Sequence, residues 1–195
     1  MNGQGSGRAN DLELPLDGMR VVVLVAEGVE DLEYWVTVMR LREAGAVVTS
    51  VGTTTEPVAG KHGLEARAER LVDQIDASTV DALVIPGGWA PDKLRRFDAV
   101  LDLVHAVHAS DKPIGIICHG GLVAISARIL LPGQPATGSL GIRDDLMNAG
   151  AEWVDKPAFR DGNFVWGRVV EDIPAFLREL VALFAEHHAR TAINR

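Results

Sequence analysis

The chain has 195 residues, which is enough for one domain with a substantial hydrophobic core and short for two. Its composition, with 47% hydrophobic and 24% charged residues, is ordinary for a soluble globular protein. The formal net charge of −8, with no basic cluster to offset it, argues against non-specific binding to nucleic acid or to an anionic membrane.

The first residues and the cysteine count bear on organisation and compartment. Residues 1–18, MNGQGSGRANDLELPLDG, are polar and glycine-rich and lack the apolar stretch of a signal peptide. We expect them to form a disordered arm ahead of a single domain over residues 19–190. One cysteine cannot form an internal disulfide, and the longest uncharged stretch, residues 113–127, is too short and polar to span a membrane. We therefore expect a cytoplasmic protein with neither a nucleic-acid partner nor a membrane partner.

The first elements form a βαβ unit. Residues 20–26, RVVVLVA, are apolar and β-branched, which predicts a strand buried on both faces. Residues 27–31, EGVED, end it with carboxylates, and the spacing then predicts a helix from Asp31 to about Ala44. One face of this helix carries Leu32, Trp35, Val36 and Met39. Residues 47–51 predict the second strand, with a right-handed crossover between the two.

The middle of the chain continues this alternation. Residues 53–63 have the glycines and proline of a loop, while residues 64–71 are compatible with a short strand pair or an irregular excursion. Residues 82–86, ALVIP, predict a buried strand that ends in Gly87-Gly88-Trp89, and helical sequence follows from Pro91.

The chain is organised around residues 111–121, DKPIGIICHGG. Residues 113–117 predict a buried parallel strand and residues 122–128 a helix, with Cys118 at the turn between them. A reactive side chain in that place has the layout of a nucleophile elbow. Because free N–H groups and the helix dipole stabilise a thiolate, we predict a depressed pKa for Cys118. A lone cysteine is as readily a small buried hydrophobe, and Cys118 alone leaves that alternative open.

The last third completes an α/β pattern. Residues 131–149 have the composition of a loop followed by a helix, and residues 153–168 predict short strands with a hairpin turn at residues 161–163. Residues 173–184 carry the apolar stripe of a helix that packs on a sheet. Alternating strands and helices predict an open, doubly wound, mostly parallel sheet with helices on both faces.

Three strand ends converge in such a sheet. Binding sites in doubly wound folds lie beyond the carboxyl ends of the strands. Residues 27–30, 87–89 and 118–119 all follow predicted strands and should meet at that edge. Their convergence predicts a site that contains Cys118.

Five motifs, in order along the chain, resemble one known family. They are GVEDLE at 28–33, GKHG at 60–63, PGGWAPDKLR at 86–95, KPIGIICHG at 112–120 and GIRDDLMNAGAEWVD at 141–155. Together they resemble the PfpI family of intracellular cysteine proteases, in the superfamily of the parkinsonism-associated protein deglycase. The resemblance covers residues 20 to about 185 and implies a flavodoxin-like fold, similar to the class I glutamine amidotransferase domain.

The resemblance also implies roles for individual residues. It makes Cys118 the nucleophile, His119 its imidazole partner, and Glu30 the carboxyl group that hydrogen-bonds the sulfur. The backbone N–H groups of Gly88 and His119 match an oxyanion hole. Asp92 stands where protease-type relatives carry a glutamate that reaches the histidine of a neighbouring subunit, so a homodimer or higher homo-oligomer is expected.

Other polar and aromatic residues keep two interpretations. Gly87 and Trp89 could border the substrate, although Trp89 could equally pack in the core. Glu33, one helical turn after Glu30, is compatible with a function or with a first-turn acid that a helix dipole favours. His105 and His108 lack a third ligand at a recognisable spacing, so no metal and no cofactor are expected.

These observations predict a cysteine-dependent hydrolase that acts on peptide, amide or glycated adducts through a thiolate and an oxyanion hole. Two alternatives stay open. One is a glyoxalase-like conversion of methylglyoxal to lactate without glutathione, and the other is a redox sensor of the stress response that turns over little substrate.

Overall fold

Seven strands form one sheet in a computed structural model that describes residues 14–193. Their order is β10-β11-β7-β6-β1-β2-β5, and every neighbouring pair is parallel except β10 with β11. The strands are β1 (Arg20–Leu24), β2 (Val47–Gly52), β5 (Arg70–Leu71), β6 (Ala82–Ile85), β7 (Ile114–Ile117), β10 (Ala158–Asp161) and β11 (Phe164–Gly167).

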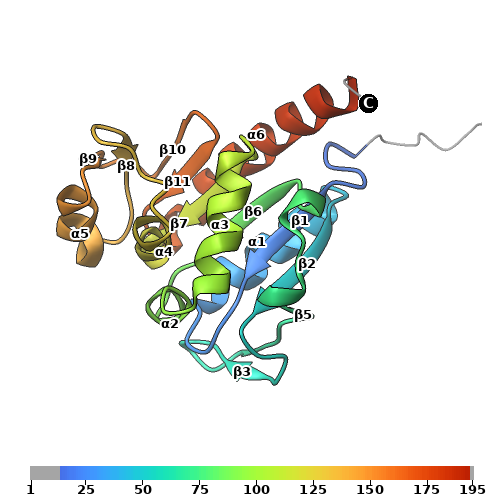
Figure 1. The fold of residues 1–195 in the computed structure, drawn as a ribbon, viewed down its shortest axis with the longest axis horizontal. Helices are drawn as coiled ribbons and strands as arrows, with labels where there is room; N and C mark the ends of the chain where they lie inside the picture. Colours follow the sequence, from blue (N-terminus) through green and yellow to red (C-terminus); the bar gives the residue numbers. More distant parts are fainter. Residues whose placement is uncertain (1–13, 194–195) are drawn as a thin grey trace, which may run out of the picture.

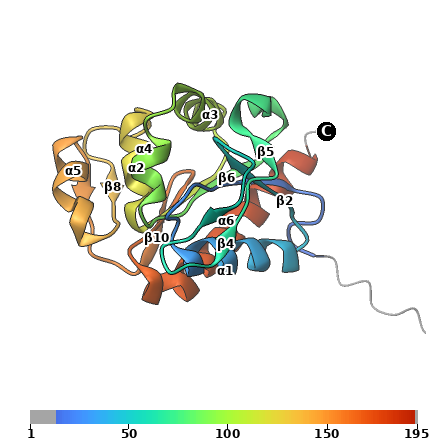
Figure 2. The same cartoon turned by 90° about the horizontal axis from the view of Figure 1, so that it is seen from below.

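Helices cover both faces of this sheet, as Figures 1 and 2 show. On one face lie α1 (Asp31–Glu43) and α6 (Ile173–Ile193). On the other lie α2 (Ala90–Leu94), α3 (Asp98–Ala109) and α4 (Gly121–Ser126). This is the flavodoxin-like, doubly wound α/β fold that the sequence predicted.

Short elements fill the connections. Beside the main sheet lie α5 (Arg143–Asn148) and the parallel pair β8 (Pro135–Ala136) with β9 (Glu152–Trp153). The segment whose structure the sequence left open contains β4 (Glu65–Ala66), which pairs with β3 (Val58–Ala59), and then β5. The 3-10 turns are Val72–Gln74, Ala77–Thr79, Cys118–Gly120, Leu140–Ile142 and Val170–Asp172.

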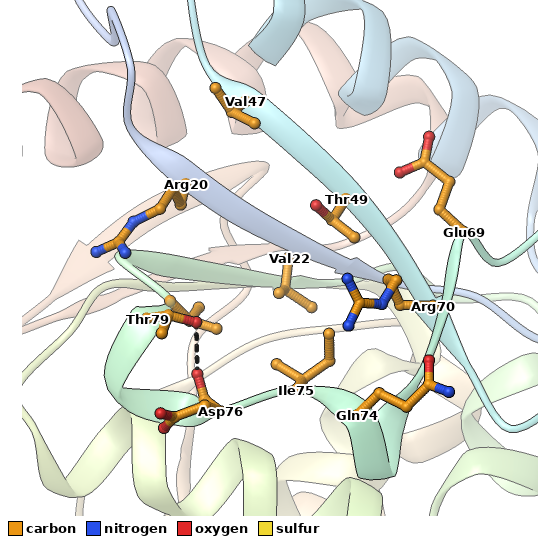
Figure 3. Close-up of a pocket in the computed structure, with 11 residues that line it drawn as sticks. Arg20, Val22, Val47, Thr49, Glu69, Arg70, Gln74, Ile75, Asp76 and Thr79 are labelled. Carbon is orange, nitrogen blue, oxygen red and sulfur yellow. Dashed lines mark hydrogen bonds between the residues drawn. The ribbon is translucent and has the colours of Figure 1, made fainter.

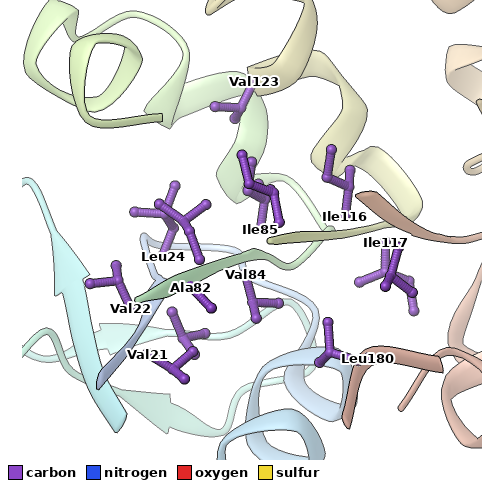
Figure 4. Close-up of a cluster of buried hydrophobic side chains, with 14 of the residues drawn as sticks. Val21, Val22, Leu24, Ala82, Val84, Ile85, Ile116, Ile117, Val123 and Leu180 are labelled. Atoms are coloured by element: carbon purple, nitrogen blue, oxygen red, sulfur yellow. The ribbon is translucent and has the colours of Figure 1, made fainter. Parts of the chain in front are cut away.

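The central strands are buried on both faces. Every residue of β6 and β7 is buried, because helices pack on each side of them. Figure 4 shows Val123 of α4 on one side of these strands and Leu180 of α6 on the other. Packing is so close that a Cβ on Gly115 would lie 2.3 Å from Cδ1 of Leu180. Strand β7, in the closely packed centre of the sheet, therefore ends directly before Cys118.

Helix α1 does not bury the apolar face that the sequence predicted. Leu32 and Met39 are 48% and 59% exposed, whereas Glu33 and Thr37 are fully buried. The side of the helix that contacts the sheet combines these two polar residues with the apolar residues Tyr34, Val38 and Leu41. Because apolar side chains usually mark the packed face of a helix, this orientation departs from the rule.

The domain begins earlier than predicted. Leu16 is fully buried, and its N–H donates to the carbonyl oxygen of Ala44 at 2.9 Å. The N–H of Gly18 likewise bonds to the carbonyl oxygen of Gly45 at 3.2 Å. The expected loose arm is therefore wrong for residues 14–18, which pack on the end of α1. Residues 1–13 of that arm lie outside the described part of the chain.

Within residues 14–193, no helix combines the length and the hydropathy that a membrane span needs.

The buried turn at Leu16 yields a stability prediction. Leu16→Ala removes a fully buried side chain and should lower the free energy of unfolding by about 2–5 kcal/mol. Leu14→Ala is the matched control, because Leu14 is 43% exposed and its loss should cost well under half as much. Urea unfolding measures both, and equal effects would show that residues 14–18 do not belong to the core.

Candidate active site

Cys118 lies at the sharp turn between β7 and α4. Its backbone φ is +59°, in the left-handed region that residues other than glycine rarely adopt, and its side chain is 9% exposed. Neighbouring glycines make room for the turn. A Cβ on Gly120 would lie 2.4 Å from the carbonyl oxygen of Ile85, and one on Gly87 would lie 2.6 Å from Cβ of Cys118. This is the geometry of a nucleophile elbow.

Two backbone N–H groups converge on the Cys118 sulfur, those of Gly88 and His119. Gly88 has a φ of +76°, and a Cβ there would lie 2.4 Å from the backbone nitrogen of Glu30. Only glycine therefore fits where the chain brings this N–H to the thiol. Donors that reach the sulfur can also reach an oxygen on a carbon bonded to that sulfur, which is the arrangement of an oxyanion hole.

The carboxyl group beside the sulfur is that of Glu33, and the predicted assignment of Glu30 to this place is wrong. Glu33 hydrogen-bonds Cys118, and its Oε2 accepts a hydrogen bond from the N–H of Gly87 at 2.7 Å. Its Oε1 is buried without a hydrogen-bond partner among the described residues. A buried oxygen with no donor favours the protonated, neutral carboxyl group.

Glu30 faces a different part of the molecule. It precedes α1 in an extended conformation, so its side chain leaves the sheet edge and meets the loop of residues 60–64. There its carboxylate lies 3.2 Å from Nζ of Lys61 and 3.4 Å from Nε2 of His62. Glu33, by contrast, lies within the first turn of α1, on the row that faces the sheet.

Cys118 and Glu33 form a coupled pair. Burial raises the pKa of Cys118 to about 12, and the Glu33 carboxylate adds to this rise although the N–H groups of Gly88 and His119 oppose it. Burial also raises the pKa of Glu33 to about 7. The predicted depression of the Cys118 pKa is therefore wrong, because desolvation and a neighbouring carboxylate outweigh the donors. Because the two groups oppose each other's charge, the pair gives up its first proton more easily than its second.

The imidazole of His119 touches the same sulfur. Its Nδ1 lies 3.2 Å from Sγ of Cys118. Burial lowers the pKa of His119, and the charge of Lys61 lowers it further. The ring is therefore neutral at neutral pH and can accept a proton or pass one on. Its Nε2 faces Gly141, where a Cβ would lie 3.4 Å away.

The loop of residues 60–64 is fastened to the start of α1. Asp31 is 3% exposed, and its carboxylate accepts hydrogen bonds from two backbone N–H groups of this loop, each at 2.7 Å. A Cβ on Gly60 would lie 2.5 Å from that carboxylate, so the loop approaches closely. The loop holds Lys61 near the site, where its charge interacts with Cys118 and Glu33.

The remaining predicted site residues, Trp89 and Asp92, are exposed near the strand ends. Trp89 is 61% exposed, and its ring covers Gly28, so it does not pack in the core. The Asp92 side chain is 56% exposed and pairs with Arg96 on its own helix. The structure of one chain leaves the contact of Asp92 with the His119 of another subunit as a prediction.

Two residues of the site were not assigned from the sequence. For Glu33 the sequence is compatible with a functional and with a capping role, and its position one helical turn after Glu30 is the available signal. Lys61 carries no signal beyond its place in the GKHG motif. A lysine between two glycines in a loop predicts no direction for its side chain, so only the folded loop places it.

Other candidate sites hold nothing comparable. Residues 14–193 contain no group of three or more His, Cys, Asp or Glu side chains that could bind a metal ion. His105 bonds to the carbonyl oxygen of Ala127, and His108 stacks on Phe164. A hollow of about 400 Å³, lined by residues such as Arg20, Val22 and Thr49, lies at the amino ends of β1 and β2 (Figure 3). That is the edge of the sheet opposite to Cys118.

The sequence of this chain matches one protein family. The model of the DJ-1/PfpI family matches residues 19–183. The chain belongs to the DJ-1/PfpI family. It is 38% identical over 165 residues to Deglycase TK1284 of Thermococcus kodakarensis, across 85% of this chain and 99% of that one. It is also 38% identical over 169 residues to General stress protein 18 of Bacillus subtilis, across 85% and 98% of the two chains.

A solved structure agrees with the fold. The structure of a two-domain protein from Anabaena variabilis, with DJ-1/ThiJ/PfpI-like and ferritin-like domains, matches with a TM-score of 0.81 and 35% identity. The match covers 84% of this chain and 47% of that one. The predicted family resemblance is thereby confirmed, and the names of its relatives include those of enzymes.

The Cys118–Glu33 pair yields a prediction of pH dependence. The pair loses its first proton near pH 7 and its second near pH 12, so the rate of Cys118 alkylation should rise through two transitions as pH increases. In Glu33→Gln the transition near pH 7 should disappear, and one transition below pH 12 should remain because no carboxylate opposes the thiolate. Iodoacetamide alkylation rates from pH 5 to pH 12 measure both.

Glu30→Gln is the matched control for that experiment. It makes the same chemical change one helical turn away, at a carboxylate that contacts Lys61 and His62 instead of the sulfur. The transition near pH 7 should therefore persist. If it vanished in Glu30→Gln and survived in Glu33→Gln, the pairing would be contradicted.

Proposed function

We propose that the chain is a cysteine-dependent hydrolase that acts on carbonyl-derived adducts of amines, the glycated adducts, and on related amide or peptide bonds. One observation carries this proposal. Cys118 stands in a strained elbow where two N–H groups and one buried carboxyl group meet at its sulfur. The relatives named deglycases support the choice of substrate class.

The site supports the following steps for an acyl substrate. The thiol proton of Cys118 moves to Glu33, and the thiolate bonds to the carbonyl carbon while the carbonyl oxygen becomes an oxyanion. The N–H groups of Gly88 and His119 stabilise that oxyanion. The amine departs with the proton from Glu33, which leaves a thioester. Water then attacks the thioester while the His119 imidazole accepts one of its protons. The carbon–sulfur bond breaks, the carboxylic acid leaves, and His119 returns the proton to the Cys118 sulfur.

The decisive experiment compares three substrates. A glycated peptide, a peptide amide and free methylglyoxal are each offered to wild type and to Cys118→Ala, with folding checked by circular dichroism. Because glycated adducts equilibrate with free carbonyl compound, an enzyme that consumes only the free compound also depletes the adduct by mass action. The measurement is therefore the initial rate of amine release against the spontaneous rate.

We expect amine release from the glycated peptide to exceed the spontaneous rate with wild type and to fall to the spontaneous rate with Cys118→Ala. Glu33→Gln should reduce turnover by roughly 10²-fold, because it removes the proton acceptor. Lactate from methylglyoxal without direct amine release would replace the proposal with the glyoxalase-like function. Oxidation of Cys118 without turnover on any substrate would replace it with the sensor function.

We also propose that the chain acts in the cytoplasm as a homodimer or higher homo-oligomer, on small carbonyl or peptide substrates and without nucleic acid or membrane. A single free cysteine fits a reducing compartment. The apolar residues that α1 exposes, Leu32 and Met39, support an assembly because such rows tend to be covered in a complex. Asp92 has a largely exposed carboxylate that another subunit could use.

The assembly proposal predicts a specific defect. If Asp92 orients the His119 of a neighbouring subunit, Asp92→Asn should reduce turnover about tenfold or more and leave alkylation of Cys118 unchanged. Asp144→Asn is the matched control, because Asp144 is an exposed carboxylate that pairs with Arg143, the residue before it. Sedimentation at assay concentration accompanies the kinetics, and a monomer with full activity would refute the shared site.

A further inference from the structure

We propose that Lys61 is an anion-recognition residue of the Cys118 site, held in place by Glu30, and that the preferred substrates carry a carboxylate close to the reacting carbon. The substrate class rests on the proposed function. The anion recognition itself rests on the geometry of the loop of residues 60–64 and is tested without turnover.

The first observation is that the loop is fixed. Its backbone is bound to the buried carboxylate of Asp31 by two hydrogen bonds of 2.7 Å, and the N–H of Lys61 donates to the carbonyl oxygen of Val29 at 2.8 Å. A lysine side chain is flexible, so a fixed backbone and an ion partner are what give its charge a constant position.

The second observation is that the two side chains of the ion pair differ in their exposure to solvent. The Glu30 side chain is 4% exposed, whereas that of Lys61 is 36% exposed, and the two groups lie 3.2 Å apart. The carboxylate therefore lies behind the ammonium group, and a molecule that enters from solvent meets the positive end first. His62 contacts the other oxygen of Glu30 and adds a second donor on the same side.

The third observation is that this charge reaches the reacting groups. Lys61 interacts electrostatically with Cys118 and Glu33. The pKa of His119 is lowered mainly by burial of the imidazole and further by the charge of Lys61. The same charge should attract an anion that is attached to the reacting carbon. In a chain with a net charge of −8, such a cation selects for anions that the rest of the protein repels.

The test uses two alkylating agents of nearly equal shape. Iodoacetate carries a carboxylate and iodoacetamide is neutral, and each bonds to the Cys118 sulfur and releases iodide. The measured quantity is the ratio of their second-order rate constants. Because both agents need the same thiolate, the ratio cancels any change in the ionisation of Cys118.

Lys61→Met should lower the iodoacetate-to-iodoacetamide ratio roughly 3- to 10-fold, as expected for the loss of one nearby charge. Lys61→Arg should retain most of the ratio. Lys93→Met is the matched control, because Lys93 also forms an ion pair with a glutamate, Glu27, and its loss changes the net charge equally. The ratio in Lys93→Met should stay at the wild-type value.

Glu30→Gln should change the ratio in the opposite direction. It removes the negative charge behind Lys61 and leaves the backbone contacts of the loop in place, so anions should gain relative to neutral agents. An unchanged ratio in Lys61→Met, or an equal fall in Lys93→Met, would overturn the assignment of Lys61. A ratio in Glu30→Gln below that of wild type would overturn the role given to Glu30.

A last comparison separates this proposal from the proposed function. Turnover is measured on a glycated peptide whose adduct carries a carboxylate and on the same peptide with that carboxylate amidated. The preference for the carboxylate should fall in Lys61→Met together with the alkylation ratio. A normal alkylation ratio with no turnover on either peptide would refute the proposed function and leave the anion site intact. Turnover that does not distinguish the peptides would refute the substrate class.

Discussion

One negative charge, shared by a thiol and a carboxyl group that are largely removed from water, is the constraint on which the site depends. Cys118 is 9% exposed and Glu33 is fully buried, so the site cannot hold two anions without a large cost. The backbone supplies donors for the one charge it does hold, from Gly88 and His119 at the sulfur and from Gly87 at the carboxylate. The glycines and the left-handed turn of the elbow follow from the need to bring these groups together.

The cost of a second negative charge also explains the ion pairs near the Cys118 site. Glu27 pairs with Lys93, Glu30 with Lys61 and Asp92 with Arg96. Each pair neutralises a carboxylate close to the strand ends, where a free one would disfavour the thiolate further. Among these three carboxylates Glu30 is the buried one, and its partner Lys61 also interacts electrostatically with Cys118 and Glu33.

Sequence patterns predicted the sheet and the location of the site, because buried parallel strands are short apolar runs and their ends carry the functional residues. They could not predict what depends on packing. Glu30 and Glu33 are one turn apart, and only the entry of the chain into α1 decides which one meets the sulfur. The pKa of Cys118 follows from desolvation, which no spacing reveals. Leu16 ends the short run LELPL, which is too brief to predict an element, so its burial is seen only in the folded chain.

Helix α1 shows how function can overrule the hydrophobic rule. Glu33 must face the sheet edge to reach Cys118, and the helical period then brings Thr37 to the same buried row, where its hydroxyl oxygen has no hydrogen-bond partner among the described residues. That row costs stability that an apolar row would have supplied. The rotation that buries Glu33 also turns Leu32 and Met39 to the surface. The orientation of one helix thus places the Glu33 carboxyl group beside Cys118 and exposes the two apolar side chains that support our proposal of an assembly.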